Sequence, residues 1–425
     1  MLRFFLGSFL TLAFTLSLSA ADWTRFRGPN GTGTAEGTLP TIDPKAPLWK
    51  VEIPGRGAGS PIVVNGKLFL QTGSADGMKR TLVCLDAKTG DTVWAKDVPG
   101  KPVPKKDPKN PADKDKTGLH DKNTLASSTP ASDGEFIYCV WWNGEALVLN
   151  AYDFAGNQKW SAPLGPYKSE HGAGHSPAVY GGKVFVNFDQ DGSAVVYAFD
   201  SKTGSKAWTA DRPAHRASYT TPFLLEQAGK PPVLVVGSTT GIDAYEPDTG
   251  KVAWHFTIAW PGMQKLRMIG CPVSVGGLLV FYMGEGGNSR YMIAIKPEGS
   301  GDISKNAKVW DVNKQCPYVP SMLARGDLLF WVHDDGRVGC TEAKTGTSIW
   351  EETLFGDKVT ASPILVGDTI LAISENGHIA LLKANKEYEL PQKLNLGEKV
   401  YASPALVDGK LYIRGTNHLF CFGKK

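Results

Sequence analysis

The stretch Asp86-Ala87-Lys88-Thr89-Gly90, followed by Trp94, decides the fold because variants of it recur along most of the chain. In each copy an acidic residue opens a short turn, a glycine closes it, and a tryptophan follows four residues after the glycine. Four further copies end in the pairs Gly156 and Trp160, Gly204 and Trp208, Gly250 and Trp254, and Gly346 and Trp350. Self-similarity at a period of about 40 to 50 residues indicates a solenoid, a propeller or a repeat array.

A second phrase lies between these copies. It consists of a small residue, a proline, an apolar run, a glycine turn and another apolar run, as in Ser60-Pro61 followed by IVVNGKLFL. Apolar runs rich in β-branched residues and bounded by turns predict strands, and proline at the first residue of a strand removes no ladder hydrogen bond. The phrase opens eight times, at Pro61, Pro130, Pro177, Pro222, Pro272, Pro320, Pro363 and Pro404.

Each unit therefore predicts four short antiparallel strands, which we name A to D. Strands A and B form a hairpin, strand C ends at the acidic residue of the turn, and strand D carries the tryptophan. Four such strands make one blade of a β-propeller, in which radial closure hides the sheet edges. The predicted fold is an all-β, eight-bladed β-propeller that forms a single domain over residues 22–425.

The two ends of the chain are expected to complete one blade together. Trp49 precedes the first Ser-Pro opening, whereas the run from Ser403 to Phe422 supplies strands A, B and C and no strand D. We expect Pro47–Ile53 to be the missing outer strand of that last blade. Leu394 holds the strand D position of one blade, and tryptophans hold the other seven: Trp49, Trp94, Trp160, Trp208, Trp254, Trp310 and Trp350.

The Ser-Pro opening, the turn ending in Lys-Thr-Gly and the tryptophan four residues later resemble the pyrroloquinoline-quinone-like (PQQ-like) β-propeller repeat over residues 47–423. The N-terminal run DWTRFRGPNG, residues 22–31, is also similar to the start of a secreted branch of this repeat family. The resemblance implies two kinds of protein. One is the quinoprotein dehydrogenases. The other is a cofactor-free group that includes the propeller subunit of the bacterial outer-membrane protein assembly machinery.

The first 21 residues are typical of a cleaved signal peptide, with an uncleaved anchor as the alternative. Arg3 supplies a positive charge, residues 4–18 are apolar, and Ser19 and Ala21 are the small residues expected before a cleavage site. The apolar run is too short to cross a bilayer. No cysteine precedes Cys84, so we expect an exported periplasmic or extracellular protein that is not a lipoprotein and has no transmembrane segment in its mature form.

The net charge and the cysteine positions bear on the expected partners and on disulfide bonds. A formal net charge of +4 over 425 residues gives no reason to expect nucleic acid as a partner, and we expect a monomer. Cys84, Cys340 and Cys421 fall in strand C of three blades, too far apart to pair, and are expected to be buried apolar residues. Cys271 and Cys316 lie near the start of strand A in adjacent blades, which leaves a 271–316 disulfide as an open alternative.

One segment lies outside the repeat. Residues 100–123 account for the longer step of 69 residues between Pro61 and Pro130, and they consist mainly of lysine, aspartate and proline. Such a segment cannot bury enough apolar surface to offset the entropy of ordering. It predicts a mobile insertion between the first two blades, either a solvated loop or a tether for a partner.

Ligand-binding candidates are concentrated in the connections from strand D to the next strand A. Strand A lines the axis of a propeller, so these connections end at the mouth of the axial funnel, which is a deep concavity. Positive and aromatic side chains outnumber acids there, which favours an anionic ligand, either small or peptidic. The predicted ligand-binding residues are His171, His175, His215, Arg216, Tyr219, Arg267, Tyr318 and Tyr401.

Two local motifs contain residue types that bind metal ions, but both are better explained as loops. The run from Glu170 to His175 has ligand types that transition metals bind, but its glycines place it in a loop, and we expect His175 to point into the funnel mouth. Asp189-Gln190-Asp191-Gly192 begins like a calcium loop and lacks the later ligands, so we expect a turn between strands B and C. Asp334-Asp335-Gly336 occupies the same position in another blade.

No catalytic motif accompanies the fold. The sequence lacks the adjacent cysteine pair that the resembling dehydrogenases stack on their quinone, and it lacks Cys-x-x-Cys-His and Gly-x-Ser-x-Gly. We therefore expect a binding or scaffold protein without catalysis or cofactor, with a small-molecule or protein partner at the funnel. The alternative is an enzyme that uses the same funnel, such as a dehydrogenase dependent on PQQ and calcium.

Overall fold

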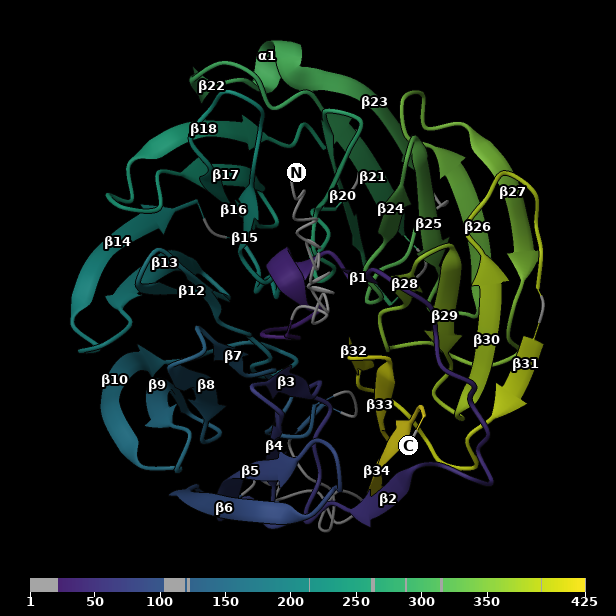
Figure 1. Ribbon diagram of the computed structural model, residues 1–425. Helices are drawn as coiled ribbons and strands as arrows, with labels where there is room; N and C mark the ends of the chain where they lie inside the picture. The colour runs from purple at the N-terminus through teal and green to yellow at the C-terminus, as the bar shows by residue number, and fades with distance from the viewer. Residues whose placement is uncertain are drawn as a thin grey trace, which may run out of the picture.

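The computed structural model describes residues 22–102, 119–120, 123–213, 215–260, 264–286, 289–313, 316–390 and 392–424. Its strands form eight sheets that stand around a central axis as blades (Figure 1). The predicted eight-bladed β-propeller is therefore confirmed. The predicted signal peptide and most of the predicted insertion, residues 103–118 and 121–122, lie outside the described residues.

Each blade is built on four antiparallel strands, with strand A nearest the axis and strand D outermost. The A strands are β3 (Ile62–Val64), β7 (Ala131–Ser132), β11 (Ala178–Tyr180), β15 (Phe223–Leu225), β19 (Val273–Val275), β24 (Leu323–Arg325), β28 (Ile364–Val366) and β32 (Ala405–Val407). The B strands are β4 (Lys67–Gly73), β8 (Phe136–Trp142), β12 (Lys183–Gln190), β16 (Val233–Gly237), β20 (Leu278–Gly284), β25 (Leu328–Val332), β29 (Thr369–Ile373) and β33 (Lys410–Arg414). The C strands are β5 (Lys79–Asp86), β9 (Ala146–Asp153), β13 (Ser193–Asp200), β17 (Gly241–Tyr245), β21 (Arg290–Ile295), β26 (Arg337–Glu342), β30 (His378–Lys383) and β34 (His418–Phe422). The D strands are β6 (Thr92–Pro99), β10 (Gln158–Pro166), β14 (Lys206–Arg212), β18 (Val252–Thr257), β23 (Lys308–Asn313), β27 (Ser348–Thr353), β31 (Gln392–Asn395) and β2 (Trp49–Glu52).

The repeated tryptophans dock each blade on the next one. A Cβ atom added to Gly204, in the C–D turn of the third blade, would lie 2.5 Å from the ring of Trp160 in the second. The Trp160 indole N–H donates to the Ser201 carbonyl in the same turn at 2.9 Å. The same bond joins Trp94 to Phe154, Trp208 to Pro247, and Trp310 to Ala343. The repeat therefore pairs glycine with tryptophan because the indole occupies the space of the missing side chain.

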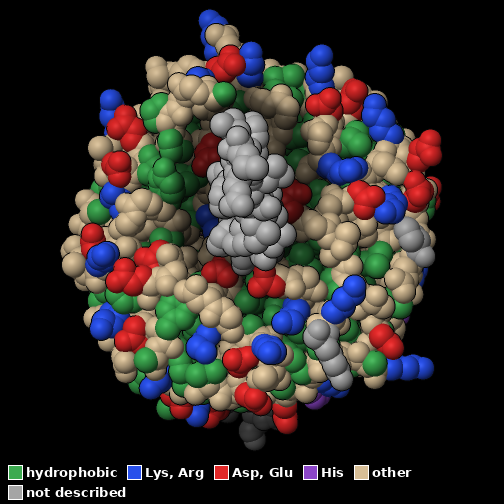
Figure 2. Space-filling model, in the orientation of Figure 1, with side chains coloured by type: hydrophobic (Ala, Val, Ile, Leu, Met, Phe, Trp, Pro, Cys, Tyr) green, Lys and Arg blue, Asp and Glu red, His purple; other side chains and the backbone are tan. Residues whose placement is uncertain are grey.

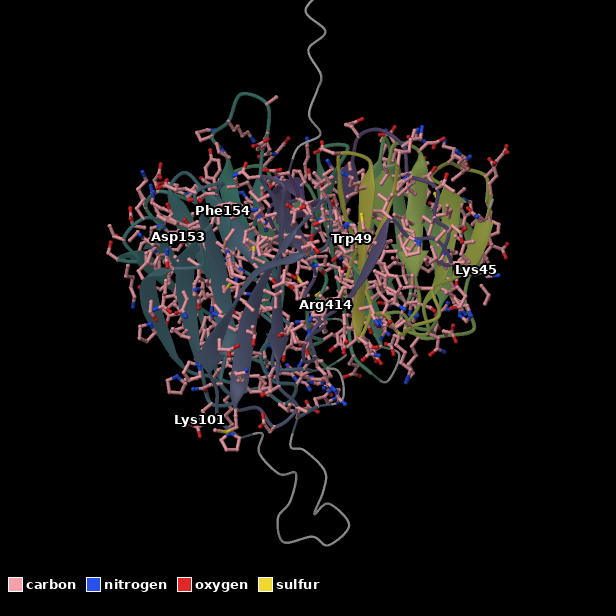
Figure 3. All side chains as sticks on the ribbon, turned by 60° about the horizontal axis from the view of Figure 1, so that its bottom comes forward. Lys45, Trp49, Lys101, Asp153, Phe154 and Arg414 are labelled. Atoms are coloured by element: carbon pink, nitrogen blue, oxygen red, sulfur yellow. The ribbon has the colours of Figure 1, made fainter. Side chains whose placement is uncertain are left out.

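The N-terminal strand closes the ring, as predicted. β2 pairs antiparallel with β34, with Trp49 opposite Cys421 and Glu52 opposite His418. In Figure 3, Trp49 lies on this strand beside the yellow strands of the last blade. The ring is thus closed by a ladder of hydrogen bonds between the two ends of the chain.

A segment before this strand, residues 22–35, crosses the centre of the ring and is named the axial plug (Figure 1). It contains a 3-10 helix, Pro29–Gly31, and a short strand, β1 (Thr34–Ala35), which pairs parallel with β28. The plug lies at the face of the A–B turns, where Asp22 accepts a hydrogen bond from the Asn65 amide. Its hydrogen bonds reach five blades, between Trp23 and Val63, Thr24 and Ser132, Arg25 and Pro222, Arg27 and Met322, and Gly33 and Leu365.

The D-to-A connections lie at the opposite face. In Figure 3, Asp153 and Phe154 mark a C–D turn at one face, and Lys101, which begins a D-to-A connection, lies at the other. Lysine and arginine side chains are interspersed with aspartate and glutamate around the face that Figure 2 shows.

The fifth blade departs from the repeat. Its C–D connection carries β22 (Gly301–Asp302), which pairs parallel with β18, and α1 (Ser304–Ala307). A two-residue strand has no alternating pattern, so the sequence gives no sign of it.

The sixth blade opens two residues later than predicted. Leu323 pairs with Phe330 as Ile62 pairs with Phe69, so Ser321 holds the position of Ser60. Met322 therefore holds the position of Pro61, and the predicted opening at Pro320 is wrong by two residues because the proline of this blade precedes the serine.

The described cysteines are buried free thiols. Cys84, Cys340 and Cys421 lie in strands β5, β26 and β34, as predicted. The alternative of a 271–316 disulfide is wrong. Cys316 packs in an apolar cluster with Trp331, whereas the Cys271 amide donates to Ser321 Oγ at the axis.

Candidate functional site

An axial cavity of about 500 Å³ opens on the face of the D-to-A connections. Phe26 of the axial plug forms its base, so the cavity is blind, and we name it the axial cup. Its wall contains the residues that open strand A, together with side chains from the D-to-A connections and the B–C turns. Its lining residues are Phe26, Ala58, Ser60, His120, Asn123, Ser127, Thr129, His171, Gly172, Gly174, Ser176, Tyr219, Thr221, Ile269, Gly286, Arg290, Tyr318, Val319, Ser321, His333, Asp334, Asp335, Lys358, Val359, Thr360, Ser362, Glu375, Tyr401 and Ser403.

A ring of hydroxyl groups surrounds the cup near its base. One residue opens each strand A, and seven of the eight bear a hydroxyl: Ser60, Thr129, Ser176, Thr221, Ser321, Ser362 and Ser403, with Cys271 in the eighth position. We name these seven the hydroxyl ring. At six of the eight positions the amide of one opening residue donates to the side-chain oxygen of the next. The Ser321 amide donates to Ser362 Oγ at 2.9 Å, and the Ser403 amide donates to Ser60 Oγ at 3.0 Å, which closes the circle between the last blade and the first.

The same bond joins Ser60 to Thr129, Thr129 to Ser176, Cys271 to Ser321, and Ser362 to Ser403. The bonds fix the direction of six of the seven side chains, so most of the ring is a preformed wall of polar groups. A hydroxyl at the same place in seven repeats is the sequence signal for it. The sequence analysis treated these residues only as small residues before a proline and therefore did not identify the ring.

Four of the eight predicted ligand-binding residues line the cup: His171, Tyr219, Tyr318 and Tyr401. They come from four different D-to-A connections, as the topology predicts. His171 is joined there by His120, from the end of the predicted insertion, with 4.1 Å between the two ring centres. Asn123 holds this end in place by donating to the His171 and Ala173 carbonyls at 3.0 and 2.8 Å.

The other four predicted residues do not line the cup. His175 is 1% exposed and packs between the rings of Tyr167 and Tyr219, so the expectation that it points into the funnel mouth is wrong. The reason is local packing, because the rings of Tyr167 and Tyr219 enclose the imidazole behind the surface of the cup. His215 is exposed, outside the lining.

Arg216 and Arg267 form an ion cluster on Glu170 beside the cup. Arg267 Nη2 lies 2.7 Å from Glu170 Oε2, and Arg216 Nη2 lies 3.3 Å from the same oxygen. The hydrogen bond from Arg267 lowers the pKa of Glu170. The positive charges of Arg216 and Arg267, which come from two D-to-A connections, are therefore partly neutralised by Glu170 within the protein.

His171 and Tyr219 in the wall and His175 behind it have pKa values that burial shifts away from pH 7, so these three side chains are neutral there. Burial lowers the pKa of His171 to about 4, with a further contribution from Arg267. Burial also lowers the pKa of His175 to about 4. The Tyr219 hydroxyl lies 2.5 Å from Ser169 Oγ, and burial raises its pKa to about 12. These groups are suited to hydrogen bonding and packing, and poorly matched to proton transfer near pH 7.

The opposite side of the cup holds carboxylates that already have partners. Asp334 accepts from the Tyr318 amide at 2.7 Å and lies 3.4 Å from Arg290. Asp335 Oδ1 lies 2.8 Å from His333 Nδ1. The B–C turn predicted for Asp334-Asp335-Gly336 is confirmed, and its position at the cup is what the sequence reasoning missed.

The side chains that line the cup do not fit a calcium ion bound together with a quinone. Calcium takes six to eight oxygen ligands, usually several carboxylates. Within the described parts of the chain, no group of three or more His, Cys, Asp or Glu side chains is placed to hold a metal ion. The cup offers hydroxyl groups instead, so no chemical step is assigned to a bound quinone.

The family of the chain follows from its sequence. The sequence model for the family described as outer membrane protein assembly factor BamB matches residues 31–123 and 115–352. The chain belongs to this family. One curated relative is quinohemoprotein alcohol dehydrogenase ADH-IIG of Pseudomonas putida, 32% identical over 200 residues, which are 42% of this chain and 25% of that protein. The match thus spans a quarter of that relative's length.

Solved structures share the fold at low sequence identity. BamB from Moraxella catarrhalis has a TM-score of 0.62 and 13% identity, with 89% of this chain and 98% of that chain covered. Quinohemoprotein alcohol dehydrogenase from Comamonas testosteroni also has a TM-score of 0.62, with 14% identity and coverage of 95% and 81%. One fold thus serves proteins with different names, so activity has to be argued from the cup. Across the described residues, no helix has the length and apolar character to span a membrane.

Proposed function

We propose that this protein is an exported, non-catalytic binding or scaffold protein that holds a small ligand or a segment of a protein partner in the axial cup. The observation that carries the proposal is the blind cup itself. The chain uses its own N-terminal segment, with Phe26 at the base, to close one end of the channel. A channel closed at one end by the protein and open at the other is suited to receiving a ligand from one face.

The chemistry of the wall supports binding without turnover. The low pKa of His171 leaves its ring neutral at pH 7, and the carboxylates Asp334 and Asp335 are engaged by Arg290 and His333. The hydroxyl groups and aromatic rings of the wall provide contact area and hydrogen bonds for a ligand. Export is supported by Arg3, the apolar residues 4–18 and the small residues that follow.

A photocrosslinking experiment tests the location of the partner. A benzoylphenylalanine placed at Tyr401, in the cup wall, is irradiated in the exported fraction of the native host. Tyr180, which is 40% exposed on β11, is the matched control site. We expect a defined crosslinked product at 401 and none at 180. Products at 180 alone, or equally at both sites, would place binding outside the cup.

A quinone-dependent enzyme is the second candidate, because the curated relative is named as a quinohemoprotein alcohol dehydrogenase. The test is incubation of the purified protein with PQQ and calcium, followed by gel filtration with absorbance detection and an assay of alcohol-dependent dye reduction. We expect no stoichiometric retention of the quinone and no dye reduction. Turnover with an alcohol would replace the binding proposal by the enzymatic one.

A further inference from the structure

Three arginines are buried around the base of the axial cup. Arg25 and Arg27 come from the axial plug, and Arg414 comes from the end of β33; they are 6%, 1% and 2% exposed. Burial of a guanidinium group in a protein usually requires a carboxylate partner, because the desolvation cost of the charge is large. These three side chains therefore need a physical explanation.

Each of these arginines hydrogen-bonds to main-chain carbonyls. Arg25 donates to Pro222 O. Arg27 donates to Met322 O at 2.6 Å and to Thr32 O at 2.8 Å. Arg414 donates to Gly59 O at 2.6 Å.

The acceptors place all three at the hydroxyl ring. Pro222 follows Thr221, Met322 follows Ser321, and Gly59 precedes Ser60. The guanidinium groups are therefore anchored one residue from three members of the ring, on different sides of the axis. Phe26 lies between Arg25 and Arg27 in sequence and forms the base of the cup.

The positive charge of these arginines is not neutralised by the protein. Among the described residues, none of the three forms an ion pair with a carboxylate, and Nε of Arg25 and both Nε and Nη1 of Arg27 are buried without a hydrogen-bond partner. Burial lowers the pKa of Arg25 to about 10 and that of Arg414 to about 9, with no carboxylate opposing the shift.

Arg212 shows how the same chain treats a buried guanidinium elsewhere. It pairs with Asp189 at 2.5 Å and with Asp243 at 3.1 Å. Arg80 is also 1% exposed and donates to the carbonyls of Gly77 and Trp142, with no carboxylate ion pair among the described residues, so a missing carboxylate alone does not mark a ligand site. Arg25, Arg27 and Arg414 differ from Arg80 because their acceptor carbonyls adjoin the hydroxyl ring of the cup.

The hydroxyl ring adds hydrogen-bond donors beside this charge. The oxygens of Ser60, Thr129, Ser176, Ser362 and Ser403 each accept an amide hydrogen bond from the neighbouring blade. Their hydroxyl hydrogens donate to no group in the described residues, and all five side chains line the cup. A circle of O–H donors around one axis matches a ligand group with several acceptor oxygens.

We propose that the base of the axial cup is an oxyanion site, in which the hydroxyl ring donates to the oxygens of a carboxylate, phosphate or sulfate group and Arg25, Arg27 and Arg414 supply the opposing charge. The inference rests on the proposed function, since it names the chemical class of the ligand that the cup holds. The buried guanidinium groups act through a medium of low dielectric constant, where their field is screened far less than in water.

Calorimetric titration with inorganic anions tests the site. Sodium phosphate, sulfate and acetate are each titrated at pH 7 and constant ionic strength, with sodium chloride as the reference. We expect saturable binding of one anion per chain. Binding of phosphate and sulfate alone identifies a tetrahedral oxyanion, and binding of acetate identifies a carboxylate.

Three variants locate the bound anion. Arg27→Met and Ser362→Ala are expected to raise the Kd at least about tenfold, as loss of a charge or of a charge-assisted hydrogen bond does. Arg80→Met is the matched control, because Arg80 is 1% exposed, donates to the carbonyls of Gly77 and Trp142, and does not line the cup. Its Kd is expected to equal that of the parent chain.

The inference is overturned if none of the three oxyanions binds more tightly than chloride, or if Arg27→Met and Ser362→Ala bind as the parent does. Should Arg27→Met fail to fold, as shown by its melting curve, Ser362→Ala decides the outcome. A crosslink at position 401 without anion binding would remove the oxyanion site and leave the proposed binding function intact.

Discussion

Gly204 sets the distance between two blades by having no side chain. Its φ of +70° strains any other residue, and an added Cβ atom would meet the Trp160 ring. Gly204→Ala is expected to destabilise the protein by about 3 kcal/mol, since backbone strain and overpacking add. Urea unfolding measures the change.

Gly192, in the B–C turn of the same blade, is the matched control. Its φ is +90°, and no atom lies within 4 Å of an added Cβ. Gly192→Ala is expected to cost about 1 kcal/mol from backbone strain alone. Equal losses for the two variants would contradict the docking role of Trp160.

His175 makes the fold sensitive to acid. Its pKa is about 4 in the folded protein and about 6.5 in an unfolded chain. Between these values the unfolded chain binds the additional proton, so the stability is complete above pH 6.5 and is lost as the pH falls toward 4. The full difference corresponds to about 3 kcal/mol.

His175→Phe is therefore expected to flatten the decline of melting temperature between pH 7 and pH 4.5. The melting temperature of each variant is compared between pH values, so a change in stability that the phenyl ring causes equally at every pH does not affect the slope. His215→Gln, at an exposed position, should keep the slope of the parent. A slope unchanged in His175→Phe would show that the acid sensitivity arises elsewhere.

Residue types alone predict only part of the site. Tyr318 and Tyr401 reach the cup because a D-to-A connection ends at the axis in every blade. Whether a side chain faces the cup depends on neighbours that come from other blades, which is why His175 is buried by Tyr167. Arg267 forms an ion pair with Glu170 and does not line the cup. The sequence analysis considered Glu170 only as a metal ligand.

At the scale of elements, the repeat predicts nearly every strand. Strands recur because the C–D turn, the tryptophan and the opening hydroxyl recur with them. β1 and β22 escape prediction because each has two residues and pairs parallel with a strand distant in sequence. The sixth blade shows that the hydroxyl of the ring, rather than the neighbouring proline, marks the start of strand A.

The clasp formed by β2 makes its own prediction. Removal of residues 22–54 deletes this strand and exposes β34 as an open sheet edge, which is prone to pairing with other chains. Removal of residues 22–46 leaves β2 in place and is the matched control. We expect the longer deletion to melt far below the shorter one and to aggregate on heating, as measured by calorimetry and light scattering. Equal melting of the two deletions would rule out the clasp as the main closure.

At the scale of the whole molecule, the N-terminal region has two parts, one that closes the ring of blades and one that closes the axial channel. β2 completes the ring from outside, and the axial plug blocks the channel from inside. The ring can be predicted from sequence because it consists of repeats. The plug occurs once, and its residues contact five blades, so no repeat reveals where Arg25 or Phe26 lies.

The deletion of residues 22–46 also tests whether the plug rests on a ring that is closed without it. The Leu365 amide donates to Gly33 O at 2.8 Å, and the Leu224 amide donates to Asn30 Oδ1 at 3.1 Å. We expect faster hydrogen exchange at these two amides in the deletion variant, because their acceptors are lost. The amides of β34, which face β2, should keep their protection.

The same variant is expected to lose oxyanion binding, since Arg25, Arg27 and the Phe26 base are removed together. Unfolding should remain a single transition, because the eight blades and the clasp persist. Loss of protection in β34 as well would mean that the plug is required for closure. In that case the plug would be part of the ring, and its arginines would have to be explained by folding rather than by a ligand in the cup.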